Sequence, residues 1–490
     1  MTTTHPRENA VVEMAPKQLL IGGSWRDATG ARTFTVEDPA TGQGLCEVAD
    51  ASAEDGLAAL AAASEAQNDW AAHAPRERGE ILRRAYEILT DRREDLALLM
   101  TLEMGKPLAE SRGEITYAAE FFRWFAEEAV RIGGDYAVAP SGTGRFLVTR
   151  QPVGPALLIT PWNFPMAMGT RKIGPAIAAG CTSVIKPAHQ TPLSMLALAD
   201  ILREAGLPDG VLNVVTAQGA GSVMEPMIRD RRARKLSFTG STAVGRKLIE
   251  QSAEQVLKVS LELGGNAPFI VFDDADLDAA VDGAMLAKMR NIGEACTAAN
   301  RFYVHTDVAE RFSAKLAERM AGLNLGRGVA DDVQVGPLID DAQLNKVTEL
   351  VSDAIDRGAE VVTGGTAANG QGHFYNPTVL TNVPREARMG TEEIFGPVAP
   401  ITTFTDEREV IDAANNTEYG LVAYLYTRDL QRGLRVTEAL ETGMVGLNQG
   451  LVSNPAAPFG GVKASGLGRE GGKVGIDEFL ETKYVAIGGL

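Results

Sequence analysis

The sequence predicts an α/β protein in which a doubly wound domain is followed by a second α/β domain. Three observations support this fold class. Between Pro155 and Leu263, apolar runs of strand length alternate with segments of helical pattern, and a second block of this kind begins near Asn266. The chain has 490 residues, which suits two large domains, and 45% of them are hydrophobic, as in ordinary globular proteins.

The first block has five expected strands, and the segments between them have helical patterns. Strands that alternate with helices at this spacing form a parallel sheet that is buried on both faces. The ligand crevice of such a sheet lies at the carboxyl ends of its strands. The expected strands are Ala156–Thr160, Thr182–Lys186, Val211–Val215, Lys235–Thr239 and Val256–Leu261, and the expected helices are Met166–Ala179, Leu193–Ala205, Gly221–Arg231 and Val244–Gln255.

The rest of the chain is expected to surround this block with a mostly helical N-terminal part and a second sheet. The first ~15 residues are expected to be a loose tail. The final strand-like run, Glu481–Ile487, could join another subunit's sheet. Helices are expected at Ser52–Ala71, Arg76–Met100, Glu114–Ile132 and Asp274–Arg290, and further strands at Pro268–Phe272, Arg301–His305, Val398–Phe404 and Leu421–Tyr426.

The composition excludes several classes of function. Lys and Arg number 47 and Asp and Glu 64, so the net charge is −17, which argues against nucleic acid and anionic membranes as partners. The longest apolar stretch, Ile173–Ile185, is too short to cross a bilayer, and the N-terminus lacks the apolar core of a signal peptide. The three cysteines and five histidines have no metal-ligand spacing, so no metal site is expected. We therefore expect a cytoplasmic protein with a small-molecule ligand.

Two loops that follow expected strands carry polar groups. In the loop Thr160–Pro165, prolines fix the backbone around Asn163, whose amide could stabilise an oxyanion or could only form an Asx turn. Gly240 and Ser241 precede an expected helix, so the backbone N–H groups there could bind a phosphate, or Ser241 could merely cap the helix. The residues alone leave both alternatives open.

Glu262 and Cys296 are the strongest candidates for chemistry. Glu262 ends an apolar strand beside two glycines, where burying a carboxylate is costly. Cys296 lies in a polar loop after the helix that ends near Arg290, which makes it a candidate nucleophile. The alternative for any cysteine is a small buried apolar residue, and this interpretation fits Cys46 and Cys181 better.

Six motifs along nearly the whole chain resemble those of the aldehyde dehydrogenase superfamily, and they occur in the family's order. The resemblance implies an aldehyde dehydrogenase-like fold, with a dinucleotide-binding domain at 1–132 and 153–264, a catalytic domain at 265–464, and a small β oligomerisation element at 133–152 and 465–490. It also implies a homodimer or homotetramer. The motifs are ITPWNFP at Ile159–Pro165, FTGSTAVG at Phe238–Gly245, LELGGNAP at Leu261–Pro268, GEACTAANR at Gly293–Arg301, EEIFGPV at Glu392–Val398 and PFGGVKASGLGRE at Pro458–Glu470.

The resemblance implies NAD(P)-dependent oxidation of an aldehyde through a cysteine thiohemiacetal and a thioester. Cys296 would be the nucleophile, and Glu262 would activate the water that hydrolyses the thioester. Asn163 would form the oxyanion hole with the backbone N–H of Cys296. Lys172 and Glu470 would relay protons behind the base.

The resemblance also implies which residues hold the dinucleotide. Lys186 would bind the adenosine ribose and Ser241 the pyrophosphate, while Glu393 would hold the nicotinamide ribose beside Phe395. His189 stands where many NAD-preferring relatives have a glutamate that would repel a 2′-phosphate. NADP is therefore the expected cofactor, with NAD as the alternative. Further cofactor-binding residues implied by the match are Thr160, Pro161, Trp162 and Gly240.

Two arginines and a serine bear on the substrate. Without the resemblance, Arg171 would be interpreted as a solvated helix residue and Arg290 as a cation at a helix C-terminus. Both positions and Ser453 resemble those of succinate-semialdehyde dehydrogenases, in which this trio binds the distal carboxylate of the substrate. The expected substrate is succinate semialdehyde, and glutarate semialdehyde or another short aldehyde is the alternative.

Some features stay open at the level of sequence. Ala298 stands where some relatives carry a second cysteine, so a disulfide switch with Cys296 is not expected. The role of Glu294 is not assigned. A cysteine hydrolase or acyltransferase without a redox cofactor is an alternative, but it would leave the Gly240–Gly245 turn and Glu393 without a function. A catalytically silent binding protein is a third hypothesis.

Overall fold

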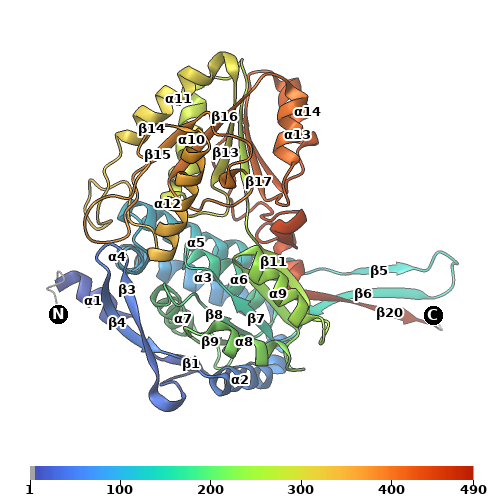
Figure 1. Ribbon diagram of the computed structural model, residues 1–490. Coiled ribbons are helices and arrows are strands. Elements are labelled where there is room, and N and C mark those ends of the chain that lie inside the picture. The colour runs from blue at the N-terminus through green and yellow to red at the C-terminus, as the bar shows by residue number, and fades with distance from the viewer. Residues whose placement is uncertain (1–5, 489–490) are drawn as a thin grey trace.

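The apolar runs between Pro155 and Leu263 form the parallel centre of an eight-stranded sheet in the computed structural model (Figure 1), which describes residues 6–488. The expected fold class is confirmed. The first five and last two residues, which the predicted tail and domain limits include, lie outside the described residues. In sheet order the strands are β19 (Gly466–Leu467), β11 (Lys258–Glu262), β10 (Lys235–Thr239), β7 (Ala156–Ile159), β8 (Ser183–Lys186), β9 (Leu212–Val214), β1 (Leu19–Ile21) and β2 (Ser24–Arg26).

Helices cover both faces of this sheet because successive residues of its strands point to opposite sides. In β7, Ala156 and Leu158 pack in one core with α3–α7, whereas Leu157 and Ile159 pack in the other with α2, α8 and α9. The helices of the domain are α2 (Ala53–Ala72), α3 (Pro75–Asp91), α4 (Arg93–Met104), α5 (Leu108–Glu128), α6 (Ala167–Ala179), α7 (Leu193–Glu204), α8 (Ala220–Ile228) and α9 (Thr242–Ser252).

A second sheet, also mainly parallel, forms the core of the other domain, shown above the first in Figure 1. One of its faces packs against α10–α12 and the other against α13 and α14. In sheet order the strands are β14 (Glu360–Thr363), β15 (Thr378–Thr381), β16 (Val398–Phe404), β13 (Ala299–His305), β12 (Ala267–Val271), β17 (Val422–Tyr426) and β18 (Met444–Leu447), and the helices are α10 (Leu277–Met289), α11 (Thr306–Ala321), α12 (Asp341–Asp356), α13 (Glu407–Asn415) and α14 (Leu430–Ala439).

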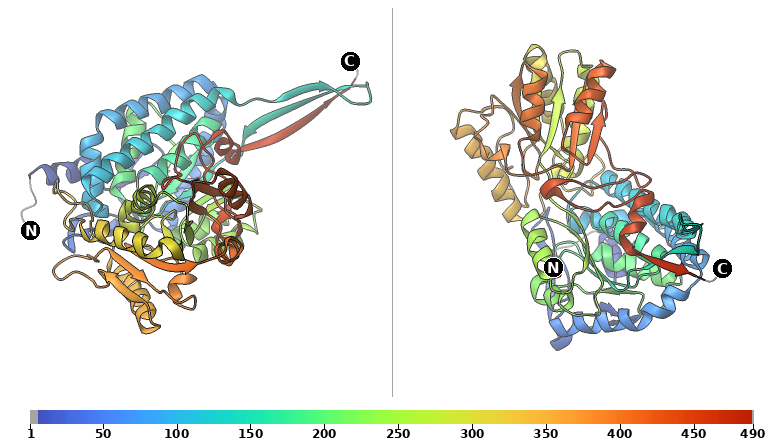
Figure 2. Two further views of the ribbon diagram at one scale, coloured as in Figure 1. Left: turned by 90° about the horizontal axis from the view of Figure 1, so that it is seen from above. Right: turned by 90° about the vertical axis from the view of Figure 1, so that its right-hand side faces the viewer.

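A three-stranded antiparallel arm projects from the body, as Figure 1 and the left view of Figure 2 show. It consists of β5 (Asp135–Val138), β6 (Arg145–Pro152) and β20 (Leu480–Ile487), with β6 in the middle. The C-terminal strand thus has a partner within its own chain, and its other edge is unpaired in the described residues. β19 pairs with β11 in the eight-stranded sheet, although it lies inside the predicted oligomerisation element 465–490. The domain limits therefore stay a prediction.

Three local expectations differ from the structure. The N-terminal part is not a loose tail followed by helices, because α1 (Pro6–Met14) is anchored by an ion pair between Glu8 and Arg327, and four strands follow it, β1, β2, β3 (Thr33–Asp38) and β4 (Gln43–Ala49). The helix expected at Arg76–Met100 is broken at Arg92. Val256 adopts a φ of 51°, so β11 begins two residues later than expected. No helix within residues 6–488 is long and apolar enough to cross a membrane.

Candidate active site

The candidate site lies where the two sheets meet. Four strands of the first sheet, β7, β8, β10 and β11, end in the loops that carry its predicted site residues. In the second domain, Cys296 precedes β13, and Glu393 and Phe395 precede β16. Hydrogen bonds join the two sides, since the Asn163 amide donates to the Glu294 carbonyl at 2.9 Å and the Gly265 N–H donates to the Glu393 carboxylate at 3.2 Å.

Cys296 follows a turn that only specific contacts can hold. Asn291 and Ile292 have φ angles of 55° and 62°, which are unfavourable for residues other than glycine. The Asn291 side-chain amide donates to the carbonyls of Asn163 and Glu294, at 3.0 and 2.8 Å, and so fixes the turn against the first domain. The thiol is partly exposed among buried neighbours. This arrangement presents a sulfur at the domain junction.

The charge state of Cys296 depends on its surroundings. Burial raises the pKa of the thiol to about 12, although Arg171 and Arg290 oppose this effect. The resting cysteine is therefore a thiol rather than a thiolate near neutral pH. Nucleophilic attack requires a group that takes the proton, as expected for a cysteine activated by an adjacent base.

Asn163 is held rigidly enough to position an oxyanion donor. Its side chain is buried, and one N–H of the amide is used by the Glu294 carbonyl, which leaves the second N–H for a ligand. The backbone carbonyl of Asn163 accepts hydrogen bonds from the Lys106 ammonium at 2.7 Å and from the Asn291 side-chain amide at 3.0 Å. The Asn163 side chain does not form the local Asx turn that was one alternative for this loop, because its amide donates to Glu294, which is remote in the chain.

Glu262 and Glu470 are two buried carboxyl groups in opposite electrostatic situations. Burial and the neighbouring charge of Glu470 raise the pKa of Glu262 well above its ordinary value, and one of its oxygens has no hydrogen-bond partner among residues 6–488. Burial opposes ionisation of Glu470, but Lys172 and Arg171 lower the pKa of this carboxyl below its ordinary value. Such a separation of pKa values suits a proton acceptor backed by a charged relay.

The predicted relay residues contact one another directly. Lys172 forms an ion pair with Glu470 and also donates to the Ser237 hydroxyl at 3.2 Å. Arg171, which directly precedes Lys172 on α6, forms a second ion pair with Glu470 at 2.7 Å. Arg171 is thus not a solvated helix residue, since its side chain is 2% exposed.

Several groups at the ends of the first sheet's strands fit a dinucleotide. Lys186 is buried without an ion-pair partner in the described residues, and burial lowers its pKa to about 8. The hydroxyls of Thr160 and Thr239 are buried and lack hydrogen-bond partners within residues 6–488. Ser241 caps α9 by accepting from the Val244 N–H, and the N–H groups of Thr242 and Ala243 before it have no partner within the helix. Buried groups that lack partners are costly, so a polar ligand would satisfy them.

The residues predicted to hold the nicotinamide end of the dinucleotide, Glu393 and Phe395, lie in the loop before β16. Burial raises the pKa of Glu393 to about 7. Phe395 has a φ of 56°, and its ring meets that of Trp162 edge-on at 5.4 Å. The backbone oxygen of Phe395 accepts from Gln343 at 2.6 Å, which holds the strained residue in place. His189 is half-buried, and burial and Lys186 lower its pKa, so it is uncharged near neutral pH.

The predicted substrate arginines, Arg171 and Arg290, both lower the pKa of the Cys296 thiol against the effect of burial. The guanidinium of Arg171 stacks on Phe459 at 3.9 Å, and that of Arg290 lies over Phe164 at 4.8 Å. Arg290 forms no ion pair among residues 6–488, and it lines a mostly apolar hollow of about 560 Å³. Ser453 lies in the loop after β18. Arg290 therefore has no direct ion-pair partner among the described residues, although its charge lowers the pKa of the nearby Glu110.

Sequence reasoning missed the ion pair that braces the oxyanion loop. Lys106 pairs with Glu114, and Glu114 accepts from the N–H groups of Met166 and Ala167, the residues after the Asn163 loop. The sequence signal for this pair was the position of Lys106 between Gly105 and Pro107, but a charged residue in such a turn is usually exposed. The pair became visible only when α4, α5 and the loop were placed together.

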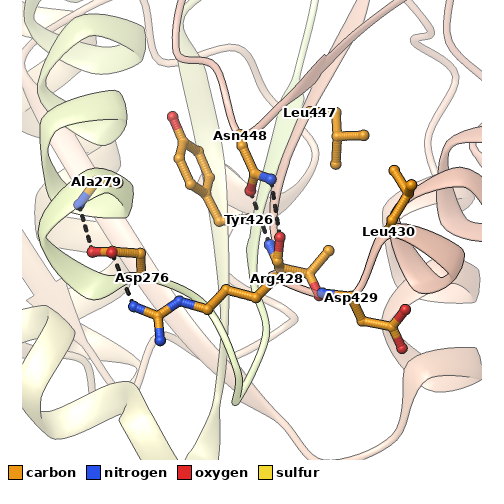
Figure 3. Close-up of a pocket in the computed structure, with 9 residues that line it drawn as sticks. Asp276, Ala279, Tyr426, Arg428, Asp429, Leu430, Leu447 and Asn448 are labelled. Carbon is orange, nitrogen blue, oxygen red and sulfur yellow. Dashed lines mark hydrogen bonds and ion pairs between the residues drawn. The ribbon is translucent and has the colours of Figure 1, made fainter.

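A hollow at the other end of the second sheet contains none of the predicted site residues (Figure 3). Its volume is about 410 Å³, and it lies at the carboxyl ends of β17 and β18. Asp276 accepts from the Ala279 N–H and from Arg428, and Asn448 donates to the Thr427 carbonyl. Because these polar groups satisfy one another as helix caps and turn contacts, they do not require a ligand.

Comparisons with known proteins agree with this geometry. The chain matches the aldehyde dehydrogenase family over residues 25–485. It is 58% identical to a succinate-semialdehyde dehydrogenase of Paenarthrobacter nicotinovorans over 90% of this chain and 98% of that protein, and 53% identical to an NADP-dependent succinate-semialdehyde dehydrogenase of Escherichia coli over 96% and 98%. A crystal structure of an Escherichia coli NADP-dependent enzyme, 52% identical, matches with a TM-score of 0.96 over 97% of this chain and 99% of that one.

Proposed function

Because the chain belongs to the aldehyde dehydrogenase family, we propose that it oxidises succinate semialdehyde to succinate with NADP, NAD being the alternative cofactor. The choice of substrate rests on the guanidinium groups of Arg171 and Arg290, which both lower the pKa of the Cys296 thiol and so lie close enough to Cys296 to interact with it. An aldehyde that reacts at Cys296 and carries a carboxylate a few carbons away would meet these cations. The similarity to succinate-semialdehyde dehydrogenases supports the same choice.

The residues of this chain divide the reaction into two stages. In the first, Cys296 releases its proton to water and attacks the aldehyde carbon, and the Asn163 amide with the Cys296 backbone N–H stabilises the resulting oxyanion. In the second, Glu262 takes a proton from the water that hydrolyses the thioester on Cys296. The Lys172–Glu470 pair receives that proton from the base. Arg171, Arg290 and Ser453 hold the distal carboxylate throughout.

The dinucleotide, when bound, supplies the acceptor for the hydride that leaves the thiohemiacetal carbon. Lys186, the orphan hydroxyls of Thr160 and Thr239, and the first turn of α9 would hold its adenosine and pyrophosphate part. Glu393 and Phe395 would hold its other end. An uncharged His189 beside Lys186 adds no negative charge near the adenosine ribose, which favours a 2′-phosphate.

We also propose that the protein is a cytoplasmic homodimer or homotetramer. The arm of β5, β6 and β20 supports an assembly, because its outer strands leave backbone edges unpaired and expose large side chains. Tyr136 is 63% exposed and Tyr484 is 65% exposed. A second subunit that covers the arm would bury these rings. Sedimentation of the purified protein tests this directly, and a monomer at micromolar concentration would contradict it.

The function is tested by a substrate panel run with NADP and NAD in parallel. Succinate semialdehyde, glutarate semialdehyde and butanal are compared by the absorbance of the reduced nicotinamide. We expect the highest kcat/KM for succinate semialdehyde with NADP. Equal values for butanal would contradict carboxylate recognition, and a strong preference for NAD would contradict the cofactor assignment. Formation of acid without reduced nicotinamide would instead support a cysteine hydrolase.

A further inference from the structure

Tyr117 on α5 has a hydroxyl whose position has no explanation within the fold. The tyrosine ring meets Phe121 edge-on at 5.0 Å, and Phe121 in turn lies under the guanidinium of Arg171 at 5.8 Å. The ring is therefore fixed by packing. The hydroxyl at its tip is shielded from solvent, and among residues 6–488 the Ser453 side chain is near enough to lower its pKa but does not meet hydrogen-bond geometry. A buried polar group without a partner is costly, so a ligand that satisfies it is favoured.

The surroundings of this hydroxyl are those of the proposed carboxylate site. Besides burial, the groups that influence the pKa of this hydroxyl are Arg171, Arg290, Ser453 and Glu470. The first three are the residues expected to bind the distal carboxylate of the substrate. Burial is the largest effect and raises the pKa of Tyr117, so the hydroxyl keeps its proton and is able to donate.

We propose that the Tyr117 hydroxyl donates a hydrogen bond to the distal carboxylate of the substrate, beside Ser453 and between Arg171 and Arg290. This inference rests on the proposed function and adds a specificity-determining residue to it. A carboxylate has lone pairs for about four donors, so two guanidinium groups and two hydroxyls can share it. Because Arg171 already forms an ion pair with Glu470, its guanidinium is only partly available to the substrate. The Tyr117 hydroxyl, a neutral donor, compensates by adding a hydrogen bond to the carboxylate.

The role of Tyr117 in specificity follows from the cost of leaving its hydroxyl unsatisfied. An aldehyde with a methyl group in place of the carboxylate would keep the hydroxyl and both arginines without an anionic partner. A site that is built to hydrogen-bond a substrate group rejects analogues that lack the group more strongly than an apolar site does. Tyr117 should thus contribute to the preference for carboxylate-bearing aldehydes.

The test is the Tyr117→Phe variant, which keeps the ring against Phe121 and removes only the oxygen. We expect the KM for succinate semialdehyde to rise about 10-fold or more, as for loss of a hydrogen bond to a charged group. The KM for butanal should change much less. The inhibition constant of succinate should rise in parallel with the KM for succinate semialdehyde, because this measurement reports binding without turnover.

A matched control is Tyr375→Phe. Tyr375 is also buried with an unpartnered hydroxyl, but burial is the only influence on its pKa. This variant should leave the ratio of the two KM values unchanged. A Tyr117→Phe enzyme with an unchanged ratio and an unchanged inhibition constant for succinate would overturn the inference. If the wild-type enzyme itself failed to prefer succinate semialdehyde over butanal, the proposed function would fail first.

Discussion

The two large sheets of this protein have the same doubly wound design but use opposite ends. In the eight-stranded sheet, Lys186, Ser241 and Glu262 all lie at or just beyond the carboxyl ends of strands. In the seven-stranded sheet, Cys296 and Glu393 lie in loops that enter the amino ends of β13 and β16. The carboxyl end of the second sheet holds the hollow of Figure 3, whose polar groups pair with one another.

The difference teaches that fold class alone does not locate a site. The rule that ligands bind at carboxyl ends agrees with the positions of the predicted site residues in the first sheet and disagrees with those in the second. The chain continues from Glu262 at the carboxyl end of β11 directly into the amino end of β12, so the two ends necessarily face each other. We infer a division of labour, in which the second domain carries the nucleophile and the groups for the nicotinamide end of the dinucleotide, and the first carries the base and the groups for the adenosine and pyrophosphate.

The sharpest way to break this comparison is Cys296→Ala. If the amino end of the second sheet supplies the nucleophile, turnover of any aldehyde should fall at least about 1,000-fold. Dinucleotide affinity, measured by binding titration, should persist because the first sheet is untouched. Cys46→Ala, which changes a half-buried cysteine of the N-terminal hairpin, is the matched control and should retain activity. Comparable turnover by the two variants would refute the assignment.

Glu262→Gln should separate the stages at the other sheet. Attack and hydride loss form one reduced nicotinamide per site, so a burst should persist. Steady-state turnover should fall by about 100- to 10,000-fold, because thioester hydrolysis lacks its base. Rapid mixing with stopped-flow absorbance distinguishes the burst from the steady state. Absence of the burst would mean that Glu262 serves the first stage as well, and the division between the sheets would fail.

Arg290→Ala sharpens the comparison by testing substrate binding on the side of the nucleophile. The KM for succinate semialdehyde should rise about 10- to 100-fold, as expected for loss of a charged hydrogen bond, with a small change for butanal. Arg319→Ala is the matched control, since Arg319 lines the same hollow but pairs with Asp282. Equal effects of Arg290→Ala on both aldehydes would contradict carboxylate recognition.

The smallest expected effect is a shift in pH dependence on the side of the base. The charge of Glu470 raises the pKa of Glu262, whereas Arg171 and Lys172 lower it. Glu470→Gln removes the first influence and frees both cations, so the pKa of Glu262 should fall. The base then stays ionised to lower pH, and the acid limb of the rate profile for thioester hydrolysis should move down by about one pH unit. A shift to higher pH would contradict the coupling of these carboxyls.

The elements with strong local patterns were predictable. The expected strands Lys235–Thr239 and Val398–Phe404 match β10 and β16 residue for residue, because each is a buried run bounded by loop residues. The family and the fold class are confirmed. The strands β1 and β2 were missed because each has three residues and they lie at a sheet edge, and β3 and β4 because they form a separate two-stranded hairpin outside the two large sheets.

The contacts of the site were less predictable than its residue types. The Lys106–Glu114 ion pair that braces the Asn163 loop, and the hydroxyl of Tyr117 beside the arginines, come from α5 and the turn before it, a region that carries no obvious chemistry. The ion pair of Arg171 with Glu470 joins residues far apart in the chain. Periodicity describes neighbours within a few residues, and it contains no information on such pairs.

The sequence by itself determined the fold class, the family and the residue types that a cysteine-dependent oxidation needs. Only the tertiary structure decided which ends of the two sheets face each other and in which direction the pKa of each buried group is shifted. Burial and the charges of distant segments raise the pKa of Glu262 and lower that of Glu470, although both are glutamates beside glycines. Desolvation and Coulomb interactions depend on distance in space, and they are therefore set by the packing of segments that are remote in sequence.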